Sequence, residues 1–177
     1  SFFQSVTTRT AGFNTADLDK MTDSGKMGMV LLMVIGGSPG STAGGMKTTT
    51  AAVLFAMAIS VFRKNEQAHL YNRRIAEETQ RNAATIFVLY MMLFTGSAMF
   101  ISYLEKVPLV TAFFETGSAI GTVGLSLGLT PTLCLASRLV LICLMFFGRV
   151  GGLTLIFATV SGKRTEYKYP QEKINVG

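Results

Sequence analysis

Two short segments of the chain each combine a threonine, a small or β-branched residue, a glycine and a large apolar residue. They are Thr10-Ala11-Gly12-Phe13 and, much later in the chain, Thr122-Val123-Gly124-Leu125. Glycine permits the positive φ angles that turn backbone carbonyls toward an axis. Stacked carbonyl oxygens of this kind can replace the hydration shell of an alkali cation. The two segments therefore predict carbonyl-lined turns, with Phe13 and Leu125 wedged against neighbouring helices.

The two turns belong to an internal repeat. Phe2-Phe3 precedes the first turn as Phe113-Phe114 precedes the second, with a one-residue gap in register. Downstream, the spacing between Gly36 and Gly148 equals the spacing between the two turns. The distance in sequence from Gly12 to Gly36 is therefore the same as that from Gly124 to Gly148. An isolated Thr-x-Gly turn is usually structural, but two copies in constant register favour a functional pair. By residue count the chain holds about one and a half repeats.

Long apolar stretches must position these turns. Hydrophobic residues make up 49% of the 177 and charged residues 15%, with a mean hydropathy of +0.43, whereas soluble domains are about a quarter charged. Three stretches are long enough for a span of about 20 residues: Met27–Gly45 (which continues through Met46 and Lys47 into the uncharged run Thr48–Phe62), Ala83–Leu104 and Leu139–Val160. Lys47 and Arg149 are the charges within them. We expect an all-α, multi-pass membrane protein, which excludes a disordered chain, a disulfide scaffold or an ordinary soluble enzyme.

Basic residues and prolines indicate the topology. The connector 63–82 and the tail 161–177 hold nine of the sixteen Lys and Arg residues, so both are expected on the cytoplasmic side. Within the connector, Glu66–Asn82 is expected to form a solvated helix. Pro108 is expected to open a short helix to about Ile120, too short to cross, and Thr130-Pro131 to open the last span. A span, a short helix, a turn and a second span form a re-entrant unit.

A glycine-rich stretch interrupts the first apolar span. Glycine costs a helix about 1 kcal/mol relative to alanine and proline about 3 kcal/mol, so the helix must break. We expect a mobile gate below the turns; the alternative is a kink packed against neighbouring helices. A phosphate-binding loop is excluded because Lys47 does not directly follow the glycine at 45 and no strand precedes the stretch. The residues are Gly36, Gly37, Ser38, Pro39, Gly40, Ser41, Thr42, Ala43, Gly44 and Gly45.

Arg149 is equivalent to Gly37 through the same offset that relates the two turns. A guanidinium at the bilayer centre costs about 2.5–3.5 kcal/mol on insertion scales and faces the protein interior or water. We expect Arg149 to face the permeation path, to repel cations and to hold the glycine-rich loop shut. The alternative, compatible with this role, is an arginine that caps loop carbonyls. Lys47 is expected to snorkel or to pair near the gate.

Three motifs resemble those of one family. Phe2–Thr15 resembles the third pore loop of the Trk/Ktr/HKT potassium transporters, Gly36–Thr48 their third-repeat intramembrane loop, and Phe147–Gly152 their arginine-bearing last span. The resemblance covers essentially the whole chain and is closest to the bacterial Ktr membrane subunit, with a Trk-type transporter as the alternative. It implies four span–pore loop–span repeats around a pseudo-fourfold pore, of which this chain is the C-terminal portion.

The resemblance implies a division of the chain and a function. Residues 1–62 would hold the third-repeat pore loop and broken span, 63–82 the connector, 83–160 the fourth repeat (span 83–104, pore helix and filter 108–126, span 131–160), and 161–177 the tail. The implied function is K⁺ uptake across the cell membrane, often Na⁺-dependent. A homodimer would carry it out under control of a cytosolic nucleotide-binding ring. The remaining N-terminal repeats of the same polypeptide would supply the other pore loops, and this chain needs no organic cofactor and no nucleic acid.

Two other classes of protein fit the residues less well. An intramembrane enzyme needs a convergent nucleophile and base, but the sole histidine, His69, lies outside the spans and no aspartate lies within one. A structural membrane subunit would not need two turns in matching register. Leu125-Ser126 and Phe13-Asn14 stand where potassium channels carry Tyr-Gly, which predicts a filter less rigidly braced than a channel's.

Overall fold

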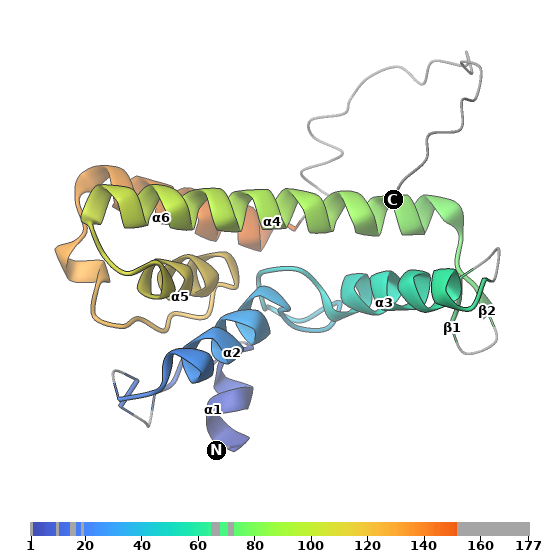
Figure 1. Ribbon diagram of the computed structural model, residues 1–177, viewed down its shortest axis with the longest axis horizontal. Coiled ribbons are helices and arrows are strands. Elements are labelled where there is room, and N and C mark those ends of the chain that lie inside the picture. The colour runs from blue at the N-terminus through green and yellow to red at the C-terminus, as the bar shows by residue number, and fades with distance from the viewer. Residues whose placement is uncertain are drawn as a thin grey trace, which may run out of the picture.

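The computed structural model describes residues 2–9, 11–14, 17–18, 20–64, 68–70 and 73–151. Thr10, the end of the expected last span and the tail lie outside these residues. The described part is mostly helical (Figure 1). Its elements are α1 (Phe2–Thr7), α2 (Asp23–Val34), α3 (Thr48–Phe62), β1 (His69–Leu70), β2 (Arg73–Arg74), α4 (Glu77–Glu105), α5 (Leu109–Ile120), the 3₁₀ helix η1 (Thr130–Thr132) and α6 (Leu135–Val150).

The longest element is α4, against which α3, α5 and α6 pack (Figure 1). Among the described residues it is the one helix long and apolar enough to cross a membrane. Its 29 residues extend about 43 Å at 1.5 Å per residue. Glu77 and Glu78 lie in its first turn, where negative charge is favourable to the helix dipole. The helix ends at Glu105, and the C-cap residue Lys106 has a left-handed φ of 55°.

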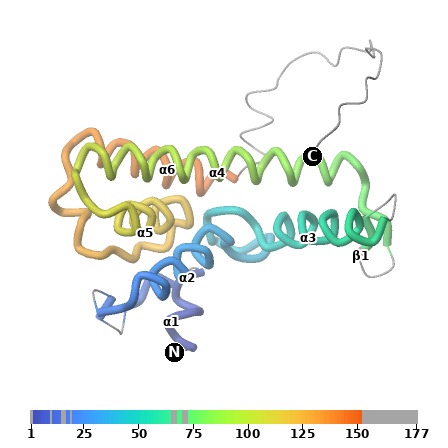
Figure 2. Tube along the Cα trace, viewed as in Figure 1, coloured from blue at the N-terminus to red at the C-terminus, as the bar shows by residue number. Residues whose placement is uncertain are grey.

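The short helix α5 packs against α2, α4 and α6, and in the view of Figure 2 α2 passes below it. All residues from Phe114 to Ile120 are buried. Gly117 allows a close approach, since a Cβ there would lie 3.3 Å from the Val30 side chain. Phe113 contacts Phe94 of α4 with ring centroids 5.1 Å apart. This burial fixes α5 and the turn that follows it.

Between α2 and α3 the chain leaves the helical conformation from Ile35 to Lys47. The two ends of this segment are bound to each other. The Gly36 amide donates to the Met46 carbonyl (2.9 Å), and the Met46 amide donates to the Val34 carbonyl (3.1 Å). The glycine-rich stretch 36–45 is therefore a loop closed at its base.

The connector differs from the expected helix. Instead of a helix from Glu66, the described residues form a two-stranded antiparallel hairpin in which His69 pairs with Arg74, and α4 begins only at Glu77. A helix that began at Arg73 would carry Arg73 and Arg74 in its first turn, where positive charge opposes the helix dipole. The acidic pair at 77 and 78 is a better start.

The last helix begins later than expected. Thr130-Pro131 opens the 3₁₀ helix η1, and α6 starts at Leu135 with Cys134 as its N-cap residue. The Cys134 side chain forms no capping bond. Instead, the Glu105 carboxylate at the end of α4 accepts a hydrogen bond from the Cys134 amide (2.9 Å). The first amides of any helix lack a hydrogen-bond acceptor within that helix. At the start of α6, a carboxylate that is distant in sequence supplies one of these acceptors.

Candidate functional site

The two Thr-x-Gly turns lie against each other. A Cβ added to Gly12 would collide with the carbonyl oxygen of Val123. Gly12 and Gly124 also share an unusual conformation, with φ of 65° and 88°. Two segments that are far apart in the sequence are thus brought into backbone contact, and each contains a glycine with a left-handed φ.

Backbone hydrogen bonds lead the chain from α5 into the second turn. The Thr122 amide donates to the Ala119 carbonyl (3.1 Å) and the Val123 amide to the Ser118 carbonyl (2.9 Å). Thr122 itself has a φ of 51°, a strained angle for a β-branched residue. Val123 and Leu125 are buried, whereas Gly124 is exposed. The turn therefore presents backbone, not side chains, at Gly124.

The first turn is held from its own short helix. The Gly12 amide donates a hydrogen bond to the backbone carbonyl of the buried Thr7 (3.1 Å). The Thr7 hydroxyl in turn donates to the Phe13 carbonyl (2.7 Å). The expectation that Phe13 wedges against helices is wrong among the described residues, because its side chain is 71% exposed. Leu125, at 4% exposed, does pack as expected. Hydrogen bonds to the backbone, rather than the aromatic ring, anchor the first turn.

The glycine-rich loop reaches the second turn directly. The Gly44 amide donates to the Thr122 hydroxyl (3.0 Å). A Cβ on Gly44 would lie 2.7 Å from that hydroxyl oxygen, so a side chain there would displace one segment or the other. Gly36, Gly37, Ala43, Gly44 and Gly45 are buried, whereas Ser38, Pro39 and Gly40 are exposed. The buried part of the loop thus faces the turn.

Two cationic side chains bind three successive carbonyls of this loop. Lys47 donates from Nζ to the Ala43 carbonyl (2.6 Å) and the Ser41 carbonyl (3.4 Å). Arg149 donates from Nη1 to the Thr42 carbonyl between them (2.5 Å). The repeat predicts that Arg149 lies level with Gly37, and Gly37 does lie beside this part of the loop, since a Cβ on it would collide with the Ser41 side chain. The carbonyl-capping role of Arg149 is therefore present in the structure.

The position of Arg149 follows from the packing of α6. A Cβ on Gly148 would collide with the Ile120 carbonyl oxygen, so α6 lies in backbone contact with the end of α5. Tyr90 of α4 donates its hydroxyl to the Phe147 carbonyl (3.4 Å). These two contacts bring the last turn of α6 next to the loop.

A family model described as TrkH, cation transport protein, matches residues 1–167. The chain belongs to the TrkH family. This TrkH-family chain is 41% identical over 184 residues to the potassium/sodium uptake protein NtpJ of Enterococcus hirae. It is 35% and 34% identical over 177 residues to the Ktr system potassium uptake protein B of Bacillus subtilis and of Vibrio alginolyticus.

Each of these three alignments covers 100% of the TrkH-family chain but 39–41% of the relative. The chain therefore spans about two fifths of the length of the curated relatives it matches. Their names describe uptake proteins, not enzymes. The matches confirm the resemblance to the Trk/Ktr superfamily, and the helical fold with a membrane-length α4 is consistent with a membrane protein of this family.

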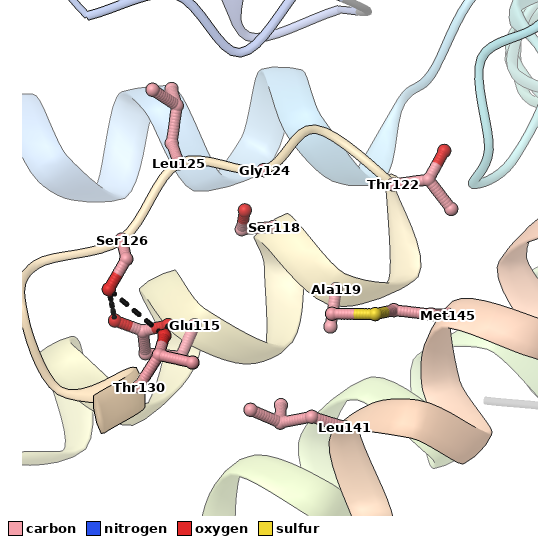
Figure 3. Close-up of a pocket in the computed structure, with 10 residues that line it drawn as sticks. All are labelled: Glu115, Ser118, Ala119, Thr122, Gly124, Leu125, Ser126, Thr130, Leu141 and Met145. Atoms are coloured by element: carbon pink, nitrogen blue, oxygen red, sulfur yellow. Dashed lines mark hydrogen bonds between the residues drawn. The ribbon is translucent and has the colours of Figure 1, made fainter. Parts of the chain in front are cut away.

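One polar residue beside the second turn was not singled out from the sequence. Glu115 of α5 is 4% exposed and lines a pocket of about 320 Å³ behind the turn, together with Ser118, Thr122 and Ser126 (Figure 3). A signal was available: Glu115 aligns with Gln4 in the repeat, which places a polar residue on the same face of two apolar helices.

Proposed function

We propose that this TrkH-family chain forms the C-terminal part of a membrane protein that takes up K⁺ through a pore. The observation that carries the proposal is the backbone contact between the turns at Gly12 and Gly124. If these turns lay far apart, they could not line the same pore axis. Their contact and their shared left-handed glycines support a joint role in binding one ion.

In the proposed selectivity filter, backbone carbonyls replace the water around the cation. Two turns supply only part of a coordination shell. The remaining N-terminal repeats of the same polypeptide supply the other two turns, which gives four span–pore loop–span units around a pseudo-fourfold axis. The relatives are longer than this chain, which leaves room for those repeats. The filter residues are Thr10, Ala11, Gly12, Phe13, Thr122, Val123, Gly124 and Leu125.

In the proposed gate, the loop 36–45 closes the path on one side of the filter. Three observations support it: the contact of Gly44 with Thr122, and the hydrogen bonds from Lys47 and Arg149 to the loop carbonyls. Opening the path requires those hydrogen bonds to break or to be exchanged for water. The exposed Arg149 also repels a cation that approaches from its side of the loop.

The remaining parts of the proposal concern the whole protein. K⁺ uptake is Na⁺-dependent, which the name of the Enterococcus relative, a potassium/sodium uptake protein, supports. The name "Ktr system" supports an assembly with further components, which we propose to be a homodimer bound to a cytosolic nucleotide-binding ring. These relatives favour a Ktr-type over a Trk-type transporter. The connector 63–82 and the tail lie in the cytoplasm, and the spans in the lipid bilayer.

Uptake of radioactive Rb⁺ by the full-length transporter in cells deficient in K⁺ uptake tests the proposal. Gly12→Ala should abolish uptake, because its Cβ collides with the Val123 carbonyl and its φ is positive. Gly96→Ala is the matched control, since nothing lies within 4 Å of a Cβ there. Uptake by the Gly12 variant at the wild-type rate, or no uptake by the wild type above empty cells, would refute the filter.

A further inference from the structure

Glu115 carries a buried carboxylate whose hydrogen bonds all go to the segment that follows the second turn. Oε1 accepts from the Ser126 hydroxyl (2.5 Å) and from the Leu127 amide (3.0 Å), and Oε2 accepts from the Thr130 hydroxyl (2.9 Å) (Figure 3). Neither ion pair of the described residues includes Glu115. Among the described residues, its charge is therefore stabilised by hydroxyl and amide donors.

A buried carboxylate is costly unless its oxygens are hydrogen-bonded, and bonds to a charged acceptor are among the strongest in proteins. Both oxygens of Glu115 are used in this way. The Ser126 hydroxyl oxygen also accepts from the Gly128 amide (3.0 Å), which extends the network by one residue. The segment from Ser126 to Thr130 is thus bound to α5, the helix that precedes the turn.

The second turn is consequently fixed at both of its ends to the same helix. On the near side, the amides of Thr122 and Val123 donate to carbonyls at the end of α5. On the far side, the Glu115 carboxylate holds Ser126, one residue after Leu125. Between the two anchors lie Val123 and Gly124, whose carbonyls the proposed filter uses.

We infer that Glu115 is a positioning residue that sets the cation selectivity of the pore. The inference rests on the proposed function. A filter distinguishes cations through the placement and number of its oxygens, so loss of the far anchor lets the carbonyls of the second turn adapt to a smaller ion. Glu115 does this without touching the ion.

The repeat provides an internal comparison. Gln4 of α1 occupies the position equivalent to Glu115 and is also buried, at 6% exposed. Its side-chain oxygen and nitrogen have no hydrogen-bond partner among the residues that the structure describes. The two turns are therefore braced unequally: a charged, fully bonded group supports the second, and a neutral amide stands behind the first.

The experiment compares variants of the full-length transporter at equal amounts in the membrane, and measures the ratio of inhibition of Rb⁺ uptake by K⁺ and by Na⁺. Glu115→Ala removes all three hydrogen bonds of the carboxylate and should lower this selectivity ratio by at least about tenfold, the effect of a single charge-assisted bond. Thr130→Val removes one donor and should shift the ratio in the same direction by less. The two changes should be less than additive, and Gln4→Ala should shift the ratio less than Glu115→Ala.

An active Glu115→Ala transporter with the wild-type ratio would overturn the inference and leave the proposed function intact. If the Glu115→Ala protein does not reach the membrane, the variants Glu115→Gln and Thr130→Val test the inference instead. A wild-type selectivity ratio in both variants would also overturn the inference. A merely structural role would reduce the amount of protein without changing the ratio. A wild-type transporter that takes up no cation would refute the proposed function and this inference together.

Discussion

The Gly44 amide donates a hydrogen bond to the Thr122 hydroxyl over 3.0 Å, although 78 residues separate the two in the sequence. This bond joins the glycine-rich loop directly to the second Thr-x-Gly turn. Thr122 already has a positive φ, so the bond stabilises a conformation that its side chain disfavours. In the proposed gate, movement of the loop would therefore be coupled to the geometry of the turn through one side chain.

Replacement of Thr122 tests this coupling. Thr122→Val keeps the shape but leaves the Gly44 amide without its acceptor, at a cost of about 1 kcal/mol to the closed loop. Thr122→Ser retains the hydroxyl. Basal Rb⁺ uptake should rise about fivefold in the valine variant and stay near wild type in the serine variant. Equal uptake by both variants would mean that the hydroxyl does not hold the loop.

Arg149→Ala should raise K⁺ flux, because it removes the hydrogen bond to the Thr42 carbonyl and a repulsive positive charge. The increase should be up to about tenfold, the value of one hydrogen bond from a charged donor. Arg138→Ala is the matched control: Arg138 is on the same helix and also donates to a carbonyl, that of Pro131 (2.7 Å), but far from the loop. Unchanged flux and gating in Arg149→Ala would remove Arg149 from the gate.

Lys47→Met should also raise basal flux, since Lys47 holds the carbonyls on either side of the one that Arg149 binds. Methionine keeps the length and apolar stem of the side chain without its donors. Because both cations act on one short segment, the double variant with Arg149→Ala should depart from additivity by about 0.5–3 kcal/mol. A double-mutant cycle of uptake rates measures the departure, and strict additivity would show that the two cations act separately.

Gly148→Ala should destabilise the folded protein. The new methyl group would meet the Ile120 carbonyl oxygen, and overpacking of this kind costs about 1–3 kcal/mol. The Tm of the purified full-length protein in detergent measures the effect. Gly96→Ala, with open space around its Cβ, should leave the Tm unchanged or raise it, since alanine favours a helix by about 1 kcal/mol. A Gly148→Ala protein as stable as wild type would contradict the close approach of α5 and α6.

Local patterns in the sequence were sufficient for several elements. The uncharged run Ala83–Leu104 lies within α4, and Pro108 directly precedes α5. Glycine and proline predicted an interruption after α2, where the helix ends at Val34. In each case the cause is the composition of the segment itself, so no knowledge of its neighbours was needed.

Elements that depend on distant partners were not predictable in this way. The late start of α6 reflects the Glu105 carboxylate at the end of another helix, and the network of Glu115 depends on a turn eleven or more residues away. Alignment of the repeats predicts that Arg149 lies level with the start of the loop, but it does not predict which carbonyl the side chain binds, that of Thr42. A sequence offset gives the level of a residue along a helix but not the direction of its side chain.

The base of the glycine-rich loop has a mechanical consequence. The amides of Gly36 and Met46 each donate a hydrogen bond to the opposite side of the loop. These bonds join α2 to α3 at the base of the loop and do not depend on the conformation of the residues within it. In the proposed gate, a swing of residues 38–45 would then be a hinge motion of a flap on a stem that also includes the hydrogen bond from the Thr48 amide to the Gly37 carbonyl (3.2 Å). Such a motion needs no rearrangement of the helices and leaves their outer surfaces as they were.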